Sequence, residues 1–373
     1  MTVPFLDLKT INLQNIDAMR QAFDRVMNSG WYILGEEVRQ FEREYAEYCG
    51  AAAAVGVANG LDALILALKA LGVGEGDEVL VPSNTYIATW LAVSHVGAKP
   101  VPVEPDPGTY NLDPERLADA LTPKTRAVMP VHLYGRPADL DSILAFAGKH
   151  GLVVVEDGAQ CHGARYKGRR IGSHGDAVAW SYYPGKNLGA IGDGGAVTTN
   201  RDDVATRLRV LRNYGSQVKY HNEVIGWNSR LDELQAALLR AKLPRLDAEN
   251  TRRSEIAATY QRGLEGLEQI GLTLPRFDAD YESAWHLYVV RHPRRDELAE
   301  RLRDRGIGTV IHYPIPPHLQ PAYRQLGIFE GQLPLSEQLH RTVLSLPLGP
   351  TQTAEQTAEV IEAVSASVRE LAS

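Results

Sequence analysis

The chain has 373 residues, of which 44% are hydrophobic and 23% charged, so it resembles an ordinary globular protein long enough for two cores. A net charge of −7 without a basic block argues against nucleic acid as the principal ligand. The two cysteines, Cys49 and Cys161, form no C-x-x-C pair, which argues against a disulfide framework or structural zinc and favours a reducing cytoplasm. No metal site is expected. The first residues lack a signal-peptide pattern and no run reaches about 18 apolar residues, so we expect no membrane span.

Two amphipathic helices are predicted at the start of the chain. Apolar residues recur at helical spacing over residues 11–28, where Asn28-Ser-Gly30 ends the pattern, and again over Glu36–Tyr48. An aromatic turn, Trp31–Gly35, joins the two helices, and a strand is expected over Ala51–Val57.

A glycine turn follows this strand and opens a dense apolar helix, Ala58–Leu68. The first N–H groups of a helix have no intrahelical acceptors, so the turn at Asn59 and Gly60 suits an anion. The alternative is a plain connection to a buried helix, and the turn alone favours that alternative.

Strands and helices then alternate as far as residue 156. The predicted strands are Glu78–Pro82, Lys99–Val103, Ala127–Val131 and Leu152–Glu156, and the predicted helices are Ala88–Val96, Leu112–Ala120 and Leu140–His150. Strands that alternate with helices of about 10–15 residues are typical of a mostly parallel sheet covered on both faces.

A carboxylate follows the last of these strands directly, in Glu156-Asp-Gly-Ala-Gln160. Asp157 therefore lies at the carboxyl edge of the sheet, where ligands bind in open α/β folds. A desolvated carboxylate there needs a cation or several hydrogen-bond donors. Asp157 as the cap of a turn is an equal alternative, and the same uncertainty holds for Gln160 and His162.

A lysine lies in a glycine-rich loop behind another buried strand, Ala177–Trp180. The loop Ser181–Gly195 holds five glycines and one proline, a composition that serves neither helix nor sheet. Glycine density and a position at a strand end favour a functional role for Lys186, and a solvated surface lysine is the alternative.

A second unit is predicted after residue 246. Before it, the sequence predicts four elements in chain order: the strand Ala196–Thr199, the helix Val204–Leu211, the polar loop Gly226–Arg230 and the helix Leu231–Lys242. Its own elements are a charged helix, a strand and three further helices, at Asn250–Leu264, Leu287–Arg291, Arg295–Arg303, 333–342 and 354–371. We predict a large α/β domain, residues 1–246, and a smaller C-terminal α+β domain, residues 247–373.

Several common sites are excluded, since the chain has no G-x-G-x-x-G after a strand, no P-loop, no G-x-S-x-G and no H-E-x-x-H. Four features remain as candidates for a site: a loop lysine, a strand-end carboxylate, a helix that begins at a glycine turn, and Tyr86 beyond another strand end. These parts match the needs of pyridoxal phosphate: a Schiff-base lysine, an anion for the pyridine nitrogen, a phosphate site and a stacking ring.

Five segments occur in the order of a known family: Gly56–Ala63, Glu156–Gln160, Tyr183–Leu188, Gly192–Gly195 and Asn228–Glu233. With them the chain resembles the DegT/StrS-type nucleotide-sugar aminotransferases, which are fold type I pyridoxal-phosphate enzymes. The resemblance implies a large domain with a mostly parallel mixed sheet between helices, and a smaller C-terminal α+β domain.

The resemblance also implies site roles. Lys186 would form the Schiff base with pyridoxal 5′-phosphate, which becomes pyridoxamine 5′-phosphate during the cycle, and would shuttle the proton. Asp157 would pair with the pyridine nitrogen, and the other cofactor contacts would be Gly60, Leu61, Tyr86, Gln160, Ser181 and Asn228. Asn228 would reach the cofactor of a neighbouring subunit in a homodimer. The implied sugar contacts are Tyr32, Ile33, Leu34, Tyr183 and His318.

The implied reaction is ping-pong transamination from L-glutamate to a nucleotide-linked keto sugar. Asn59–Leu61 and Tyr182–Lys186 resemble most the branch that aminates C3 of dTDP-3-keto-6-deoxyhexoses. A 4-aminotransferase for a dTDP- or UDP-4-keto sugar, and a 3-aminotransferase for a UDP-3-keto sugar, are the alternatives. Leu61 departs from the threonine of many relatives, so a hydroxyl contact to phosphate is lost.

Three rivals to an aminotransferase remain. A related sugar dehydratase would have histidine in place of Lys186, a decarboxylase or lyase would use the same scaffold, and a regulator would need an added DNA-binding module for which no region is spare.

Overall fold

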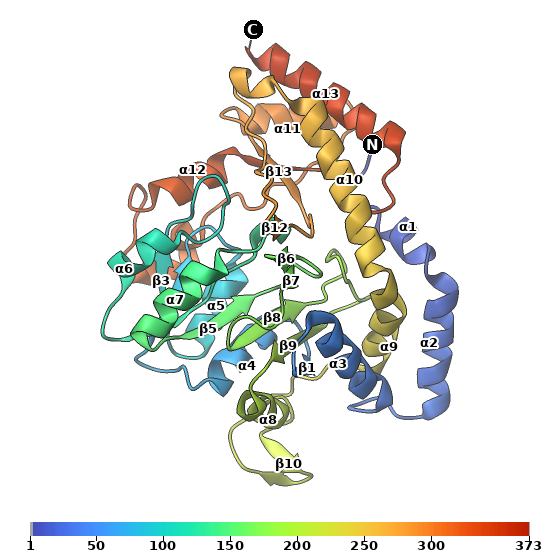
Figure 1. Ribbon diagram of the computed structural model, residues 1–373, viewed down its shortest axis with the longest axis vertical. Coiled ribbons are helices and arrows are strands. Elements are labelled where there is room, and N and C mark those ends of the chain that lie inside the picture. The colour runs from blue at the N-terminus through green and yellow to red at the C-terminus, as the bar shows by residue number, and fades with distance from the viewer. Residues whose placement is uncertain (1–2, 373) are drawn as a thin grey trace.

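The computed structural model describes residues 3–372 and is organised around a seven-stranded sheet (Figure 1). Its strand order is β1-β9-β8-β5-β4-β2-β3, with bounds Ala53–Val57, Gly195–Thr199, Ala177–Ser181, Val153–Asp157, Thr125–Val128, Glu78–Pro82 and Lys99–Val103 in that order. β9 runs antiparallel to both β1 and β8, and the remaining pairs are parallel. The expected mostly parallel mixed sheet is confirmed.

Helices cover both faces of this sheet (Figure 1). They are α3 Glu36–Cys49, α4 Gly60–Ala70, α5 Ile87–His95, α7 Leu140–His150, α8 Asp202–Leu211 and α9 Glu233–Lys242. Along β2, Val79 and Val81 lie in the core that contains residues of α4, α5 and α8, whereas Leu80 lies in a core with residues of α7. In β8, Ala179 shares the first of these cores, and Trp180 packs with α3 and α9. Alternate residues therefore face opposite covered surfaces, which explains the near-continuous apolar strands.

The parallel strands bring two predicted site residues to one edge. Asp157 is the last residue of β5 and Ser181 is the last residue of the adjacent β8. The carboxyl ends of parallel strands meet at the same edge, so the loops after β2, β5 and β8 lie together there.

The N-terminal helix predicted over 11–28 is two helices in the structure. They are α1, Leu8–Leu13, and α2, Ile16–Ser29, and Asn15 between them has φ −114° and ψ 11°, outside the helical region. The predicted stop is confirmed, because Gly30 ends α2 with φ +64°, a conformation that glycine adopts at little cost.

The helix predicted over Leu112–Ala120 was too long. Leu112 pairs with Pro105 in a β-bridge, and the Asp113 carboxylate accepts a hydrogen bond from the Glu115 N–H and starts a 3₁₀ turn, Pro114–Arg116. Only α6, Leu117–Ala120, is α-helical. A capping aspartate before proline is typical of a helix start, so the helical pattern was extended two residues too far.

The C-terminal part packs around a second core. It contains α10 Leu246–Leu264, α11 Arg295–Asp304, α12 Pro334–Thr342, α13 Ala354–Ala372 and the antiparallel pair β13 Tyr288–Arg291 with β14 Val343–Leu346. Val3 belongs to the same core and pairs with Ile307, so the start of the chain packs on this part. The domain division after residue 246 stays a prediction.

Small strands complete the fold. β6 Arg165–Tyr166, β7 Arg169–Arg170 and β12 Tyr281–Glu282 form one sheet, and β10 Ser216–Val218 pairs with β11 His221–Asn222 in a hairpin. Within residues 3–372, the helices are all too short or too polar to cross a membrane.

Candidate active site

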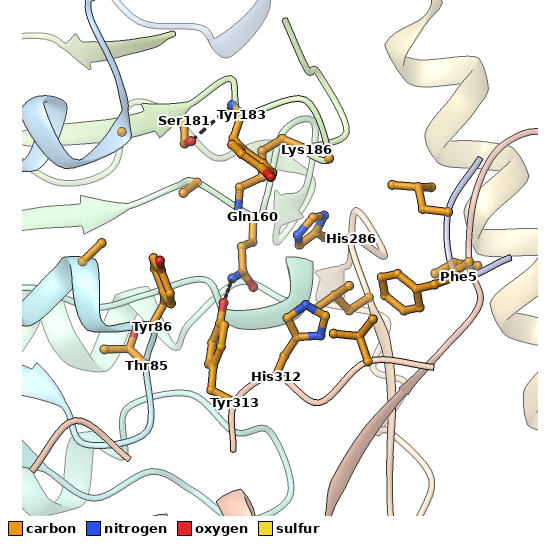
Figure 2. A pocket seen from close by; sticks show the side chains of 18 of the residues that line it. Phe5, Thr85, Tyr86, Gln160, Ser181, Tyr183, Lys186, His286, His312 and Tyr313 are labelled. Carbon is orange, nitrogen blue, oxygen red and sulfur yellow. Dashed lines mark hydrogen bonds between the residues drawn. The ribbon is translucent and has the colours of Figure 1, made fainter. Parts of the chain in front are cut away.

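A cavity of about 1280 Å³ lies at the carboxyl edge of the sheet, facing the C-terminal part (Figure 2). From the sheet side its lining includes Asn59, Gly60, Leu61, Thr85, Tyr86, Asp157, Gln160, Ser181, Tyr183 and Lys186. From the opposite side its lining includes Phe5, His286, Glu300, Arg303, His312 and Tyr313. Most residues predicted to bind the cofactor therefore share one cavity.

The amine of Lys186 is placed by the loop after β8. The Lys186 N–H donates to the Tyr183 carbonyl at 2.8 Å, which closes a tight turn and leaves the side chain at the cavity (Figure 2). Burial lowers the pKa of Lys186 to about 8, and the charge of Asp157 opposes that shift. About a tenth of the amine is therefore uncharged at pH 7, far more than for a solvated lysine, and the uncharged amine is the nucleophile.

Asp157 is held in one orientation by two donors. Its Oδ2 accepts from Thr89 Oγ1 at 2.9 Å, and its Oδ1 accepts from the Ala159 N–H at 3.1 Å. Burial raises the pKa of Asp157, while these hydrogen bonds and the charge of Lys186 act in the other direction. A carboxylate so poorly solvated is stabilised by a further cationic partner, and a protonated ring nitrogen is such a partner.

The start of α4 forms a narrow cradle with the end of β8. A Cβ on Gly60 would lie 2.5 Å from the Ser181 Cβ, so only glycine fits here without a shift. Asn59 caps the helix by accepting from the Asp62 N–H at 2.9 Å. The N–H groups of Gly60 and Leu61 belong to the first turn and have no acceptors within the helix, and the Ser181 hydroxyl lies beside them. The cradle suits a phosphate.

Tyr86 and Gln160 complete the sheet side of the cavity, and both contact Tyr313 of the opposite side. Tyr86 is 52% exposed, and its ring lies 5.1 Å from the ring of Tyr313. Gln160 accepts from the Tyr134 N–H at 2.6 Å and donates through Nε2 to the Tyr313 hydroxyl at 3.0 Å. Because an amide nitrogen has two hydrogens, one remains for a ligand.

Several predicted residues lie outside the cavity lining: Tyr32, Ile33, Leu34, His318 and Asn228. The first three belong to the turn between α2 and α3, where Tyr32 and Ile33 are exposed and Leu34 is half-buried. Asn228 is exposed beside the Asn213 backbone. His318 is buried, with its Nε2 3.3 Å from a Glu337 oxygen. Of the predicted sugar contacts, Tyr183 alone lines the cavity, and the roles of the others stay predictions.

The side of the cavity opposite the sheet was not predicted from the sequence. His312 and Tyr313 come from a segment without regular structure after α11, and His286 comes from the residues before β13. Proline density at Pro314, Pro316 and Pro317 marks the first segment as irregular, and irregular segments carry binding residues more often than helices do. The proline density could therefore have pointed to His312 and Tyr313. No pattern in the sequence pointed to His286.

Several known proteins with matching sequences are transaminases. The dTDP-3-amino-3,4,6-trideoxy-alpha-D-glucose transaminase of Streptomyces venezuelae is 55% identical over 97% of this chain and 95% of its own. The dTDP-3-amino-3,6-dideoxy-alpha-D-galactopyranose transaminase of Aneurinibacillus thermoaerophilus is 53% identical over 97% of this chain and 98% of its own. The crystal structure of S. venezuelae DesV in complex with a ketimine intermediate, 55% identical, matches with a TM-score of 0.96 over 99% of this chain and 98% of that one.

The cavity fits the cofactor of such enzymes. It combines an amine with a lowered pKa, a carboxylate with a raised pKa and a cradle that a Cβ on Gly60 would fill. The expected cofactor, pyridoxal 5′-phosphate, is confirmed by the family and by related structures in the pyridoxal and pyridoxamine phosphate forms. The family model matches residues 14–365, and the chain belongs to the DegT/DnrJ/EryC1/StrS aminotransferase family.

Proposed function

We propose that this enzyme transfers an amino group from L-glutamate to C3 of a dTDP-linked 3-keto-6-deoxyhexose. The observation that carries the proposal is the Lys186 amine, with its pKa lowered to about 8, in one cavity with the buried Asp157 carboxylate. The C3 position and the dTDP group are supported by the names of the two transaminases that are more than half identical to this chain.

Lys186 and Asp157 carry the chemistry in this proposal. When bound, pyridoxal phosphate supplies an aldehyde carbon that carries the amino group and a ring that accepts electrons. Lys186 would hold the cofactor covalently between turnovers, and its Nζ would move the proton to and from the carbon that exchanges the amine. Asp157 would pair as an anion with the ring nitrogen and keep that nitrogen protonated.

The remaining sheet-side residues bind and orient the cofactor. The N–H groups of Gly60 and Leu61 and the Ser181 hydroxyl would donate to the phosphate. Ser181 Oγ accepts from the Tyr183 N–H at 3.3 Å, so its own hydrogen is free to donate to the phosphate. Leu61 contributes no hydroxyl, which leaves its backbone as the donor. Tyr86 would stack on the ring, and Gln160 would donate to the phenolic oxygen of the ring.

The enzyme acts as a homodimer in the cytoplasm, with Asn228 reaching the phosphate of the partner subunit's cofactor. Exposed apolar residues on and beside α2 support a subunit interface: Phe23, Met27, Trp31, Tyr32 and Ile33. Two buried, unpaired cysteines, Cys49 and Cys161, suit a reducing compartment. Sedimentation of the purified protein at twice the chain mass tests the dimer, and a monomer with full activity would contradict it.

The function is tested by incubating the purified enzyme and glutamate with 3-keto and 4-keto sugars linked to dTDP or UDP. Mass and carbon position of the product are read by mass spectrometry and NMR. We expect amination at C3 of the dTDP-linked sugar with one 2-oxoglutarate formed for each amine. Conversion of a 4-keto sugar alone would reject the C3 proposal, and conversion of a UDP-linked sugar alone would reject the dTDP proposal.

A further inference from the structure

His286 lies in the cavity beside Lys186, and the proposed function assigns it no role. It belongs to the segment between β12 and β13 and lines the cavity together with His312 (Figure 2). Its Nδ1 lies 3.2 Å from Oδ1 of Asn187, the residue that follows Lys186 in the chain. The state of this imidazole decides which groups a substrate can present to it.

Two backbone carbonyl groups determine the orientation of the amides behind His286. Asn250 donates through Nδ2 to the His162 carbonyl at 2.7 Å, which leaves its Oδ1 to accept from Asn187 Nδ2 at 2.8 Å. Asn187 Nδ2 also donates to the Ala284 carbonyl at 2.7 Å. Both hydrogens of the Asn187 amide are therefore used, and its Oδ1 can only accept from His286.

This arrangement places the imidazole proton on Nδ1 of His286. The pKa of His286 lies well below its ordinary value, first because the ring is buried and then because of the charges of Lys186 and Arg253 and the neighbouring imidazoles of His312 and His162. The ring is consequently neutral, and Nε2 carries a lone pair without a proton.

We propose that His286 Nε2 accepts a hydrogen bond from a hydroxyl group of the keto sugar and so acts as a substrate-selecting residue. A sugar hydroxyl has a hydrogen to donate, whereas a carboxylate offers only acceptor oxygens and is repelled by a bare nitrogen lone pair. The amino donor carries carboxylates, so the residue favours the sugar half of the reaction. This inference rests on the proposed function, because it takes the keto sugar as the ligand.

Measuring the two half-reactions separately distinguishes substrate selection by His286 from a structural role of this residue. Glutamate alone converts the cofactor to its amine form, and the keto sugar alone converts it back, so each half is followed by absorbance. The variant His286→Phe keeps a ring and removes the acceptor. We expect its half-saturating sugar concentration to rise about tenfold, because one hydrogen bond to a buried acceptor is lost. The glutamate half should change less than about twofold. His286→Gln, which retains an acceptor oxygen, should recover most of the sugar affinity.

A second measurement is independent of activity. Nitrogen-15 spectra of histidine-labelled holoenzyme, assigned by comparison with His286→Gln, should show a proton on Nδ1 and none on Nε2. The inference is overturned by a proton on Nε2, by an equal loss in both half-reactions, or by no change in the sugar half. A wild-type enzyme that aminates no keto sugar would overturn the proposed function as well, whereas a normal wild-type rate with an unaffected His286→Phe would overturn this inference alone.

Discussion

The two walls of the cavity are built in different ways. The sheet wall, formed by Gly60, Tyr86, Asp157, Ser181 and Lys186, comes from the ends of strands and the start of a helix. The opposite wall takes Phe5, His286, His312 and Tyr313 from connecting segments of the N-terminal and C-terminal parts. It also includes Glu300 and Arg303 from helix α11.

The chemistry of the two walls differs in the same way. The sheet wall holds an amine and a carboxylate whose pKa values are shifted by burial. Such shifted pKa values are typical of catalytic sites. Besides Glu300 and Arg303, the opposite wall presents rings that are uncharged near neutral pH, since burial lowers the pKa of His312 to about 4 and raises that of Tyr313. We therefore propose that the sheet wall carries the cofactor chemistry in both half-reactions and that the opposite wall selects the substrate.

The largest expected effect in this comparison is that of Lys186→Ala. Proton transfer by a positioned group contributes about 10²–10⁴-fold, and the covalent link to the cofactor is lost as well. Both half-reactions should fall by at least that factor, and borohydride should fix no cofactor to the chain. Lys167→Ala, a lysine paired with Asp141 on the surface, is the matched control and should keep its rate. Substantial transamination by Lys186→Ala without an added amine would contradict the assignment.

Asp157→Asn is expected to cost somewhat less. The amide keeps the shape of the carboxylate and removes the charge that faces the ring nitrogen, so both half-reactions should slow by about 100-fold, the size of effect seen when one electrostatic contact to a reacting group is removed. Single-turnover rates with glutamate and with keto sugar measure this. Asp141→Asn removes an exposed carboxylate and serves as control. A lower rate in the sugar half-reaction alone would contradict the proposed division of roles between the two walls.

Gly60→Ala should weaken cofactor binding more than it affects any later step. The new Cβ would meet the Ser181 Cβ at 2.5 Å, and relief of such overpacking costs about 1–3 kcal/mol, or about 5- to 150-fold in affinity for pyridoxal phosphate. Titration of the apoprotein measures it. Gly148→Ala in α7 is the control, because a Cβ there meets nothing within 4 Å and alanine should stabilise the helix by about 0.5–1 kcal/mol. Equal affinity in Gly60→Ala and wild type would remove Gly60 from the phosphate site.

The sheet wall could be predicted from the sequence for a physical reason. Lys186, Asp157 and Gly60 lie within a few residues of strand ends, and parallel strands bring their carboxyl ends to one edge whatever the intervening helices do. His286 and Lys186 are 100 residues apart, and their approach depends on how the C-terminal part packs, which no local pattern records. The overlong helix predicted over Leu112–Ala120 has a local cause instead, because Asp113 caps the turn that begins at Pro114 and Leu112 is held in a bridge to Pro105.

A pH dependence should appear in the capture of pyridoxal phosphate by the apoprotein. Burial lowers the pKa of Lys186 to about 8 from 10.5, so the nucleophilic uncharged amine forms above pH 8 and is lost below it. The capture rate, followed by absorbance and borohydride fixation, should rise about tenfold per pH unit well below the midpoint and level off above about pH 8. A midpoint near 10.5 would mean that Lys186 is solvated and the sheet wall is not a buried reacting centre.

The smallest expected effect tests the bond that joins the walls. Gln160 donates to the Tyr313 hydroxyl, while the Tyr134 N–H holds the other end of the same amide. Tyr313→Phe therefore removes one hydrogen bond and leaves Gln160 in place, a loss of about 0.5–1.5 kcal/mol, or about 2- to 13-fold. Because Tyr313 belongs to the opposite wall, we expect this loss in the half-saturating concentration of keto sugar, with the absorbance of the bound cofactor unchanged. A shifted cofactor spectrum with normal sugar affinity would instead assign Tyr313 to the cofactor through Gln160, and the two walls would then act as one.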